Sequence, residues 1–238
     1  MSQALKPNSS HPPRSTDSER VARGIERLRE EAEKADGPAA QRCIEDLLES
    51  PPTRDLLSGI LGNSGFLTQS LAREIEFLPV IFGDGPDAAF KHVIAELNTL
   101  DPASAQKDTD IALRRAKRRV ALLTALGDLS GVWPLETVTA CLSSFCETAL
   151  SKASGNLLRA LHDRDILRLP DPDRPETGSG FIILGMGKLG ACELNYSSDV
   201  DLIVLFDDET TPAADLAEIQ QHFIRMTRGL VKSMDERT

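Results

Sequence analysis

The stretch from Phe181 to Asp208 constrains the fold of this chain more than any other part. It begins with a short apolar run, Phe181 to Leu184, which contains β-branched residues and ends at a glycine, a pattern typical of a buried strand. Three glycines and a lysine follow within six residues, and a second apolar run extends from Leu202 to Phe206. This order predicts a strand, a glycine turn, a short helix and a second strand.

Two aspartates come just before the second apolar run, and their spacing carries the chemical interpretation. Residues two apart on a strand project to the same face, so we expect Asp199 and Asp201 to share a face while Val200 and Leu202 enter a core. Two such carboxylates repel each other unless a cation lies between them. Their oxygens suit Mg²⁺, which proteins usually bind together with substrate phosphates. The pattern therefore predicts a metal-dependent nucleotidyl-transfer site.

Three other interpretations compete for these residues. Residues 185–190 match the dinucleotide fingerprint GxGxxG, but only about nine residues separate Gly190 from the next strand, and a parallel crossover needs about a dozen or more. The pair Gly187-Lys188 also resembles a P-loop, but Leu189 stands where Ser or Thr binds magnesium and Ile182 stands where the first glycine is needed. The third interpretation is a tight turn followed by a strand whose acidic residues merely face solvent.

The same residues resemble a known family. The stretch GMGKLGACELNYSSDVDLIVLF is similar to the nucleotidyltransferase motif of the bifunctional glutamine synthetase adenylyltransferase/adenylyl-removing enzymes, which runs GxGKLGxxELNxxSDxDL. The matching positions are Gly185, Gly187, Lys188, Leu189, Gly190, Glu193, Leu194, Asn195, Ser198, Asp199, Asp201 and Leu202. Ala191-Cys192 replaces the glycine-rich pair expected there. The upstream run LRRAKRRVALLTALGDLSGV also resembles the family, so the similarity covers most of residues 40–238.

This resemblance implies a mostly α protein with a partial α/β (α+β) nucleotidyltransferase domain of the DNA polymerase β-like superfamily, preceded by a helical N-terminal region. It implies a two-metal site in which Asp199 and Asp201 hold Mg²⁺, with Mn²⁺ as an alternative, about 3.5–4 Å apart. Glycines let the backbone approach phosphate, and a helix N-terminus offers N–H groups to it. The residues expected to bind nucleotide phosphate are Gly185, Gly187, Lys188, Gly190 and Ser198.

The family's activity, as the resemblance implies it, is transfer of an adenylyl group to or from a tyrosine of glutamine synthetase, with ATP or ADP as the nucleotide. The first catalytic domain removes AMP by phosphorolysis and the second adds AMP from ATP. The helical lead-in and the ELNxSSD form of the motif resemble the first domain, so we expect deadenylylation, with adenylylation as the close alternative. A PII-type signal protein is the expected regulatory partner. Another hypothesis makes the chain a non-catalytic helical module that binds glutamine synthetase or that signal protein.

A third carboxylate normally completes such a site. The family carries it on a later strand, in a segment resembling FRVDLRLRP, and no such segment occurs in this sequence. One or two strands also could not cover the catalytic sheet. We therefore expect the chain to be a fragment or truncated product that holds the first portion of the catalytic domain.

Composition excludes several other classes of protein. The net charge is −10, from 37 acidic and 27 basic residues, which argues against a general nucleic-acid binder. The four cysteines show neither a CxxC motif nor a histidine at zinc spacing, which is typical of reduced thiols. No apolar run approaches the roughly 18 residues of a membrane span, and the N-terminus lacks an apolar signal core. These features predict a soluble cytoplasmic protein.

The organisation of the rest of the chain follows from helical patterns and their breaks. Residues 1–18 are polar and rich in Pro and Ser, so we expect a disordered tail. Residues 19–168 form the expected helical domain, with helices over 19–35, 41–49, 53–61, 66–77, 109–127 and 135–162. Residues 169–180 are rich in proline and glycine, so we expect them to form a linker. Residues 181–238 are then the start of the nucleotidyltransferase domain.

Two further expectations concern particular helices. The basic residues between Arg114 and Arg119 are interpreted as a solvated face paired with nearby acids, rather than as a patch for an acidic partner, and Trp133 as a packing anchor. Thr211-Pro212 supplies an N-cap with proline at the first helical position of a final helix. The expected core face of that helix is Leu216, Ile219, Phe223, Met226, Leu230 and Met234.

Overall fold

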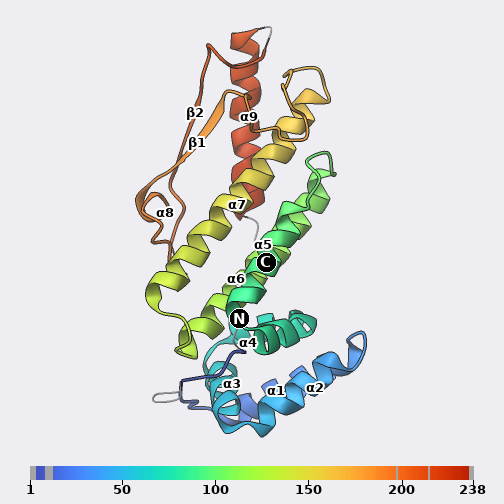
Figure 1. The fold of residues 1–238 in the computed structure, drawn as a ribbon, viewed down its shortest axis with the longest axis vertical. Coiled ribbons are helices and arrows are strands. Elements are labelled where there is room, and N and C mark those ends of the chain that lie inside the picture. Colours follow the sequence, from blue (N-terminus) through green and yellow to red (C-terminus); the bar gives the residue numbers. More distant parts are fainter. Residues whose placement is uncertain (1–3, 9–12, 197, 214, 236–238) are drawn as a thin grey trace. The chain divides into compact units, whose positions relative to one another are not determined.

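The computed structural model describes residues 4–8, 13–196, 198–213 and 215–235. They form two compact units, which are described separately. Unit 1 comprises residues 1–93 and 118–141, and unit 2 comprises residues 94–117 and 142–238. The division falls within three helices, α5 (Pro86–Asn98), α6 (Gln106–Leu129) and α7 (Leu135–His162) (Figure 1). The predicted boundary at 169–180 lies inside unit 2 and stays a prediction.

Unit 1 begins with α1 (Ser18–Lys34), α2 (Ala39–Glu49), α3 (Pro51–Asn63) and α4 (Gly65–Arg73). The N-terminus of α1 is capped by the Asp17 carboxylate, which accepts a hydrogen bond from Arg20 N–H at 2.8 Å. Its buried positions are Gly24, Leu28 and Ala32, four residues apart, so a single stripe of this charged helix packs inward. These helices agree with the sequence pattern, and among the described residues before 181 no strand occurs.

The predicted helix over 66–77 is wrong in its last four residues. The α-helix ends at Arg73, and a 3₁₀ turn, η1 (Ile75–Phe77), and a π-helical turn, η2 (Val80–Asp84), follow. Glu74 leaves helical geometry at the break, with φ −107° and ψ 30°, and its carboxylate is buried at 4% exposure. There it accepts hydrogen bonds from Arg118 Nε at 2.6 Å and Arg119 Nε at 2.8 Å.

The basic residues of α6 therefore have a role that the sequence did not predict. Arg118 and Arg119 do pair with an acid, as expected, but Arg119 is buried, so this part of α6 is not a solvated face. The guanidinium carbon of Arg119 also lies 4.4 Å from the centroid of the Phe77 ring, a cation–π distance. A buried carboxylate bound by two guanidinium groups links α6 to the turn after α4.

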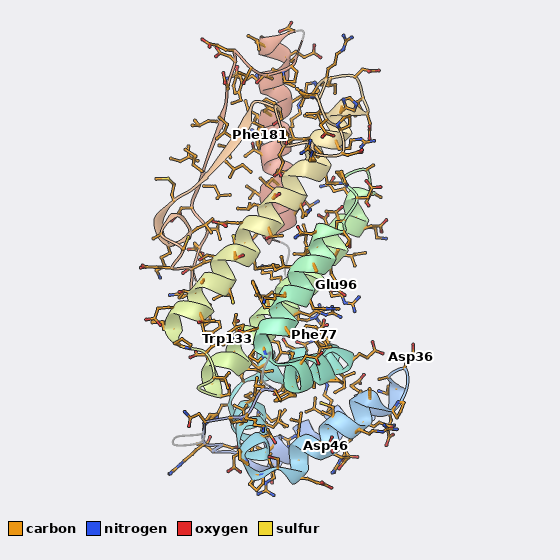
Figure 2. All side chains as sticks on the ribbon, viewed as in Figure 1. Asp36, Asp46, Phe77, Glu96, Trp133 and Phe181 are labelled. Atoms are coloured by element: carbon orange, nitrogen blue, oxygen red, sulfur yellow. The ribbon has the colours of Figure 1, made fainter. Side chains whose placement is uncertain are left out.

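Two other contacts join distant segments of unit 1. Trp133 is buried as predicted, and its indole N–H donates to Asp87 Oδ1 at 2.9 Å, which ties the α6–α7 connection to the start of α5 (Figure 2). In the segment expected to be disordered, residues 1–3 and 9–12 lie outside the described residues. Leu5, however, is buried and its N–H donates to Phe82 O at 3.2 Å, a contact that the composition did not predict.

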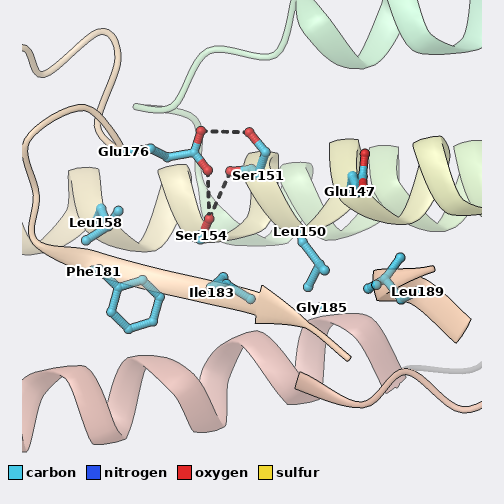
Figure 3. A pocket seen from close by; sticks show the side chains of 11 residues that line it. Glu147, Leu150, Ser151, Ser154, Leu158, Glu176, Phe181, Ile183, Gly185 and Leu189 are labelled. Carbon is cyan, nitrogen blue, oxygen red and sulfur yellow. Dashed lines mark hydrogen bonds between the residues drawn. The ribbon is translucent and has the colours of Figure 1, made fainter. Parts of the chain in front are cut away.

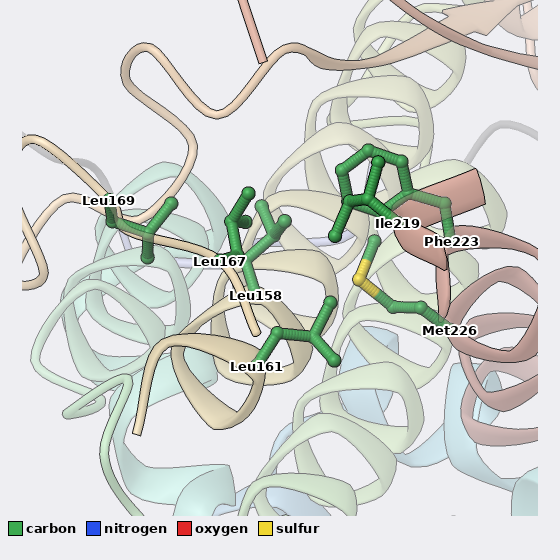
Figure 4. Packing of buried hydrophobic residues seen from close by; sticks show 7 residues of the cluster. All are labelled: Leu158, Leu161, Leu167, Leu169, Ile219, Phe223 and Met226. Atoms are coloured by element: carbon green, nitrogen blue, oxygen red, sulfur yellow. The ribbon is translucent and has the colours of Figure 1, made fainter. Parts of the chain in front are cut away.

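Unit 2 contains the remaining parts of α5, α6 and α7, then β1 (Phe181–Gly185), α8 (Gly187–Gly190), β2 (Leu202–Phe206) and α9 (Leu216–Asp235). The two strands pair antiparallel, with Phe181 opposite Phe206 and Gly185 opposite Leu202. A cluster of apolar side chains from α7, the segment after it and α9 forms the core (Figure 4); it consists of Leu158, Leu161, Leu167, Leu169, Ile219, Phe223 and Met226. The described part of the chain is mostly helical with a small two-stranded sheet, as expected.

The two faces of the sheet have different environments. Phe181 and Phe206 lie on the face toward the core, where their ring centroids are 5.1 and 5.8 Å from that of Phe223. The side chains of the opposite face are all at least 40% exposed: Ile182, Leu184, Ile203 and Leu205. Period-2 alternation thus holds along both strands, but the outer face is apolar rather than polar.

The predicted start of the last helix is wrong. α9 begins at Leu216, and the Asp215 carboxylate caps it by accepting from Ala217 N–H at 2.8 Å and Glu218 N–H at 3.1 Å. Asp is the better N-cap residue, and the Thr211 hydroxyl donates instead to Asp207 O within the turn after β2. The inner face is as expected from Ile219 to Leu230, whereas Leu216 is exposed.

Candidate functional site

The glycine-rich segment turns the chain between the two strands. β1 ends at Gly185, the single helical turn α8 follows, and β2 returns antiparallel to β1. Dinucleotide fingerprints require two parallel strands joined by a crossover helix. The antiparallel pairing therefore excludes that interpretation for residues 185–190, and the predicted order of strand, turn, short helix and strand is confirmed.

Gly187 and Asp201 lie next to each other at the end of this hairpin. Met186 N–H donates to Asp201 O at 2.9 Å, which continues the pairing of the two strands by one residue. Gly187 has φ +53°, a conformation that favours glycine, and a Cβ placed on it would lie 3.4 Å from Asp201 Oδ2. The Asp201 carboxylate thus lies directly beside the backbone of the turn, at contact distance from where a side chain on Gly187 would begin.

Gly185 and Gly190 have a packing role that the sequence did not predict. A Cβ on Gly190 would lie 2.5 Å from Gly185 O, and a Cβ on Gly185 would lie 3.0 Å from the Leu189 side chain. Leu189 is buried beneath the turn. A side chain on Gly190 would thus displace α8 from the end of β1, and one on Gly185 would press on Leu189.

The two aspartates precede the strand rather than lying on it. β2 begins at Leu202, so Asp199, Val200 and Asp201 belong to the loop that leads into it. Both aspartates are exposed, as a substrate-facing pair needs to be. The expectation that Val200 enters a core is wrong, because its side chain is exposed. The predicted strand therefore extended three residues too far toward the N-terminus, although Asp201 O still continues the pairing by accepting from Met186 N–H.

Ser198 and Lys188 complete the predicted set. The Ser198 hydroxyl donates to Asn195 Oδ1 at 2.6 Å and accepts from Asn195 N–H at 3.2 Å, so it closes a local turn just before Asp199. Lys188 is exposed on α8. Asn195 is a residue whose contribution to the site was not predicted, although the motif contains it. Its position three residues before Ser198 is typical of a side-chain turn.

A contact from α7 was also missed. The Ser143 hydroxyl oxygen accepts a hydrogen bond from Leu194 N–H at 3.1 Å, and both residues are buried, at 2% and 7% exposure. We name residues 191–196 and 198–201 the Asp loop. The bond joins the Asp loop to a helix more than fifty residues earlier in the chain, within unit 2. No local sequence signal could have indicated this pairing.

The face of β1 opposite the exposed one borders a pocket of about 350 Å³ against α7 (Figure 3). Glu176, from the segment before β1, accepts hydrogen bonds there from Ser151 Oγ at 2.7 Å and Ser154 Oγ at 3.1 Å. Gly185, Leu189 and Gly190 close the end of the pocket nearest the turn. The segment that was expected to be a linker is therefore bonded to α7.

The donors around the turn suit a magnesium ion shared with a phosphate. Among the described residues no group of three or more His, Cys, Asp or Glu side chains gathers as a metal site, so the protein offers the two aspartates. Mg²⁺ is commonly held by one or two carboxylates, with water and substrate phosphates as its other ligands. Asp201, which lies beside Gly187, and Asp199, which is exposed two residues earlier, are the carboxylates that this segment provides for this mode of binding.

Comparison with known protein families finds a match over most of the chain. A sequence model of the family described as glutamate-ammonia ligase adenylyltransferase matches residues 55–238, well over half of the chain. The chain belongs to this family. The resemblance inferred from the motif is therefore confirmed, and the matched region contains both the helices after residue 55 and the candidate site.

Curated relatives within the adenylyltransferase family carry the same name, bifunctional glutamine synthetase adenylyltransferase/adenylyl-removing enzyme. The relative from Bradyrhizobium diazoefficiens is 39% identical over 202 residues, which cover 84% of this chain and 20% of the relative. The Bartonella quintana relative is 40% identical over 187 residues, 77% of this chain and 19% of the relative. This chain thus spans about a fifth of the length of these relatives. No helix in the described ranges is long and apolar enough to cross a bilayer.

Proposed function

We propose that this chain supplies the first portion of a nucleotidyltransferase domain, of the DNA polymerase β-like type, that acts on glutamine synthetase. The observation that carries the proposal is the position of Asp201, whose carboxylate lies beside Gly187, a glycine with positive φ in the turn between the two strands. The names of the relatives supply the chemical class, which is adenylyl transfer to, and removal from, glutamine synthetase. We assign the removal reaction, phosphorolysis of the adenylylated tyrosine to give ADP, to this domain.

In this proposal the residues of the turn have separate tasks. Asp199 and Asp201 hold Mg²⁺, or Mn²⁺ in its place, and the bound ion neutralises charge on the reacting phosphate group. Gly187 leaves the space beside Asp201 open, while Gly185 and Gly190 keep α8 tight against β1. Lys188 adds positive charge at the surface of the turn. Ser198 either holds the Asp loop through Asn195 or turns its hydroxyl to the phosphate.

The experiment is release of ADP from adenylylated glutamine synthetase, with inorganic phosphate and Mg²⁺, by an enzyme of full family length that carries this sequence. Asp199→Asn and Asp201→Asn each remove one carboxylate, and we expect at least about 100-fold lower kcat, as for loss of a major electrostatic group. Asp208→Asn is the matched control, because Asp208 is exposed just beyond β2. ADP release that survives both substitutions together would exclude the metal site. If the two substitutions instead abolish synthesis of adenylylated glutamine synthetase from ATP, this domain performs adenylylation.

A second candidate is a non-catalytic module that binds glutamine synthetase or a PII-type signal protein. It is favoured by the two-carboxylate donor set, because the described residues do not bring a third acidic group to the turn. The module would be supported if adenylylated glutamine synthetase binds to the full-length enzyme and no ADP is released. This result is needed for the enzyme of unchanged sequence as well as for its Asp208→Asn control. In either case we propose that the protein acts in the cytoplasm, where glutamine synthetase is its partner, rather than on nucleic acid or at a membrane.

A further inference from the structure

One face of α7 carries three serines within unit 2. Ser143, Ser151 and Ser154 are separated by eight and three residues, spacings that return to the same side of a helix. Ser143 and Ser154 are almost fully buried. We name this surface the serine face of α7. All three hydroxyl groups bind segments that flank the glycine turn.

The first contact holds the segment that leaves the turn. Ser143 Oγ accepts from Leu194 N–H, and Leu194 lies between α8 and the two aspartates. The Leu194 side chain is buried as well, so water cannot easily replace the serine as acceptor. Because a buried N–H without a partner is unfavourable, loss of this acceptor would favour conformations in which the Asp loop leaves α7.

The other two contacts hold the segment that enters the turn. Ser151 and Ser154 both donate to Glu176, which lies five residues before β1. Ser179, three residues further on, is fully buried, and its hydroxyl accepts from Phe181 N–H at 3.2 Å, at the first residue of the strand. The chain is thus fixed to the same helix face before β1 and after α8.

We propose that the serine face of α7 positions the candidate site, with Ser143 as a positioning residue that sets the Asp loop, and hence the carboxylates, against the glycine turn. This inference rests on the proposed function. Ser143 acts through Leu194 N–H and the loop backbone and does not itself contact the reacting groups. Ser151, Ser154 and Glu176 fix β1, and so fix Gly187 beside Asp201.

The first test measures the hydrogen bond in this chain without any assay of activity. Ser143→Ala removes the acceptor, and Ser144→Ala is the matched control because Ser144 is the adjacent, exposed residue on the same helix. Hydrogen–deuterium exchange read on peptides covering 191–196 should be at least about tenfold faster in Ser143→Ala than in the control. Equal exchange in both variants would overturn the inference. If Ser143→Ala fails to fold, Ser143→Cys, with its weaker acceptor, should change exchange in the same direction.

The second test measures positioning in the full-length enzyme. Ser143→Ala should raise the Mg²⁺ concentration for half-maximal ADP release about five- to tenfold, which corresponds to one hydrogen bond of ordinary strength. The KM for adenylylated glutamine synthetase should be unchanged. Ser143→Thr, which keeps the hydroxyl, should restore the Mg²⁺ dependence. A fall in kcat with unchanged Mg²⁺ dependence would show that Ser143 only stabilises the fold and would overturn the inference.

The two tests separate failure of this inference from failure of the proposed function. If the full-length enzyme without substitutions releases no ADP, the proposed function is overturned, and the positioning role with it. The comparison of hydrogen–deuterium exchange between Ser143→Ala and Ser144→Ala still decides whether Ser143 holds the Asp loop. Normal ADP release together with equal exchange rates overturns this inference alone.

Discussion

Replacement of Glu74 by glutamine tests the buried ion group of unit 1. The carboxylate is 4% exposed and accepts from two guanidinium groups, of which Arg119 is also buried. Breaking a buried ion pair by neutralising one partner leaves uncompensated charge and costs about 3–5 kcal/mol. The exposed pair of Arg29 and Glu45, at 2.9 Å, is the comparison, because a surface pair contributes about 0–1 kcal/mol.

The assay is urea denaturation followed by tryptophan fluorescence. The chain has one tryptophan, Trp133, which is buried in the same unit as Glu74, so its emission reports on unit 1. With a urea m-value of about 2 kcal/mol/M, a loss of about 3 kcal/mol lowers the midpoint by about 1.5 M. Glu45→Gln should lower it by less than about 0.5 M. Equal shifts for the two variants would refute the argument that burial makes the Glu74 group important.

Two further predictions concern the cysteines and the glycine turn. Burial raises the pKa of three thiols to about 11; these are Cys43, Cys141 and Cys146. At pH 8 they are almost entirely protonated, so they should react slowly with iodoacetamide. The exposed Cys192 should be labelled first. The labelling rate of the other three should rise about tenfold per pH unit up to about pH 10, as measured by mass spectrometry of peptides, and equal labelling of all four at pH 8 would contradict the assigned burial. Gly190→Ala should shift α8 away from β1, since its Cβ would meet Gly185 O at 2.5 Å, and should lower stability by about 1–3 kcal/mol with loss of ADP release in the full-length enzyme. Gly229→Ala on α9 is its control, because the added Cβ would lie 3.7 Å from the Leu157 side chain, an ordinary contact distance. A loss of equal size there would indicate a general effect of alanine for glycine.

Sequence reasoning predicted the features that depend on local pattern. The apolar runs gave β1 and β2, the glycine spacing gave α8, and the long helix over 135–162 was predicted with its observed limits. The motif placed Asp199, Asp201 and the glycines in one segment, and in the structure Asp201 lies beside Gly187, whereas the role of these residues as a site stays a prediction. These features arise from residues near each other in sequence, where period and turn chemistry act directly.

The features that were missed depend on contacts between distant residues. Glu74 ends its helix where its carboxylate meets two arginines more than forty positions later, and the pattern of Phe66 to Phe77 alone does not indicate this. The cap at Thr211 was assigned on a local rule, whereas a second candidate, Asp215, lay four residues on. Ser143 is one of several serines on α7, and only the folded Asp loop distinguishes it from its exposed neighbour.

The outer face of the small sheet has a consequence for the colloidal behaviour of the chain. Its four large aliphatic side chains are exposed, and in the part of the chain described each strand has one edge without a strand partner. Open edges of this kind favour pairing between molecules. Repulsion between molecules that each carry a net charge of −10 opposes this pairing. The range of that repulsion falls to about 3 Å at 1 M salt. Concentrated salt should therefore bring molecules of this chain together through the hairpin, and dilute buffer should keep them apart.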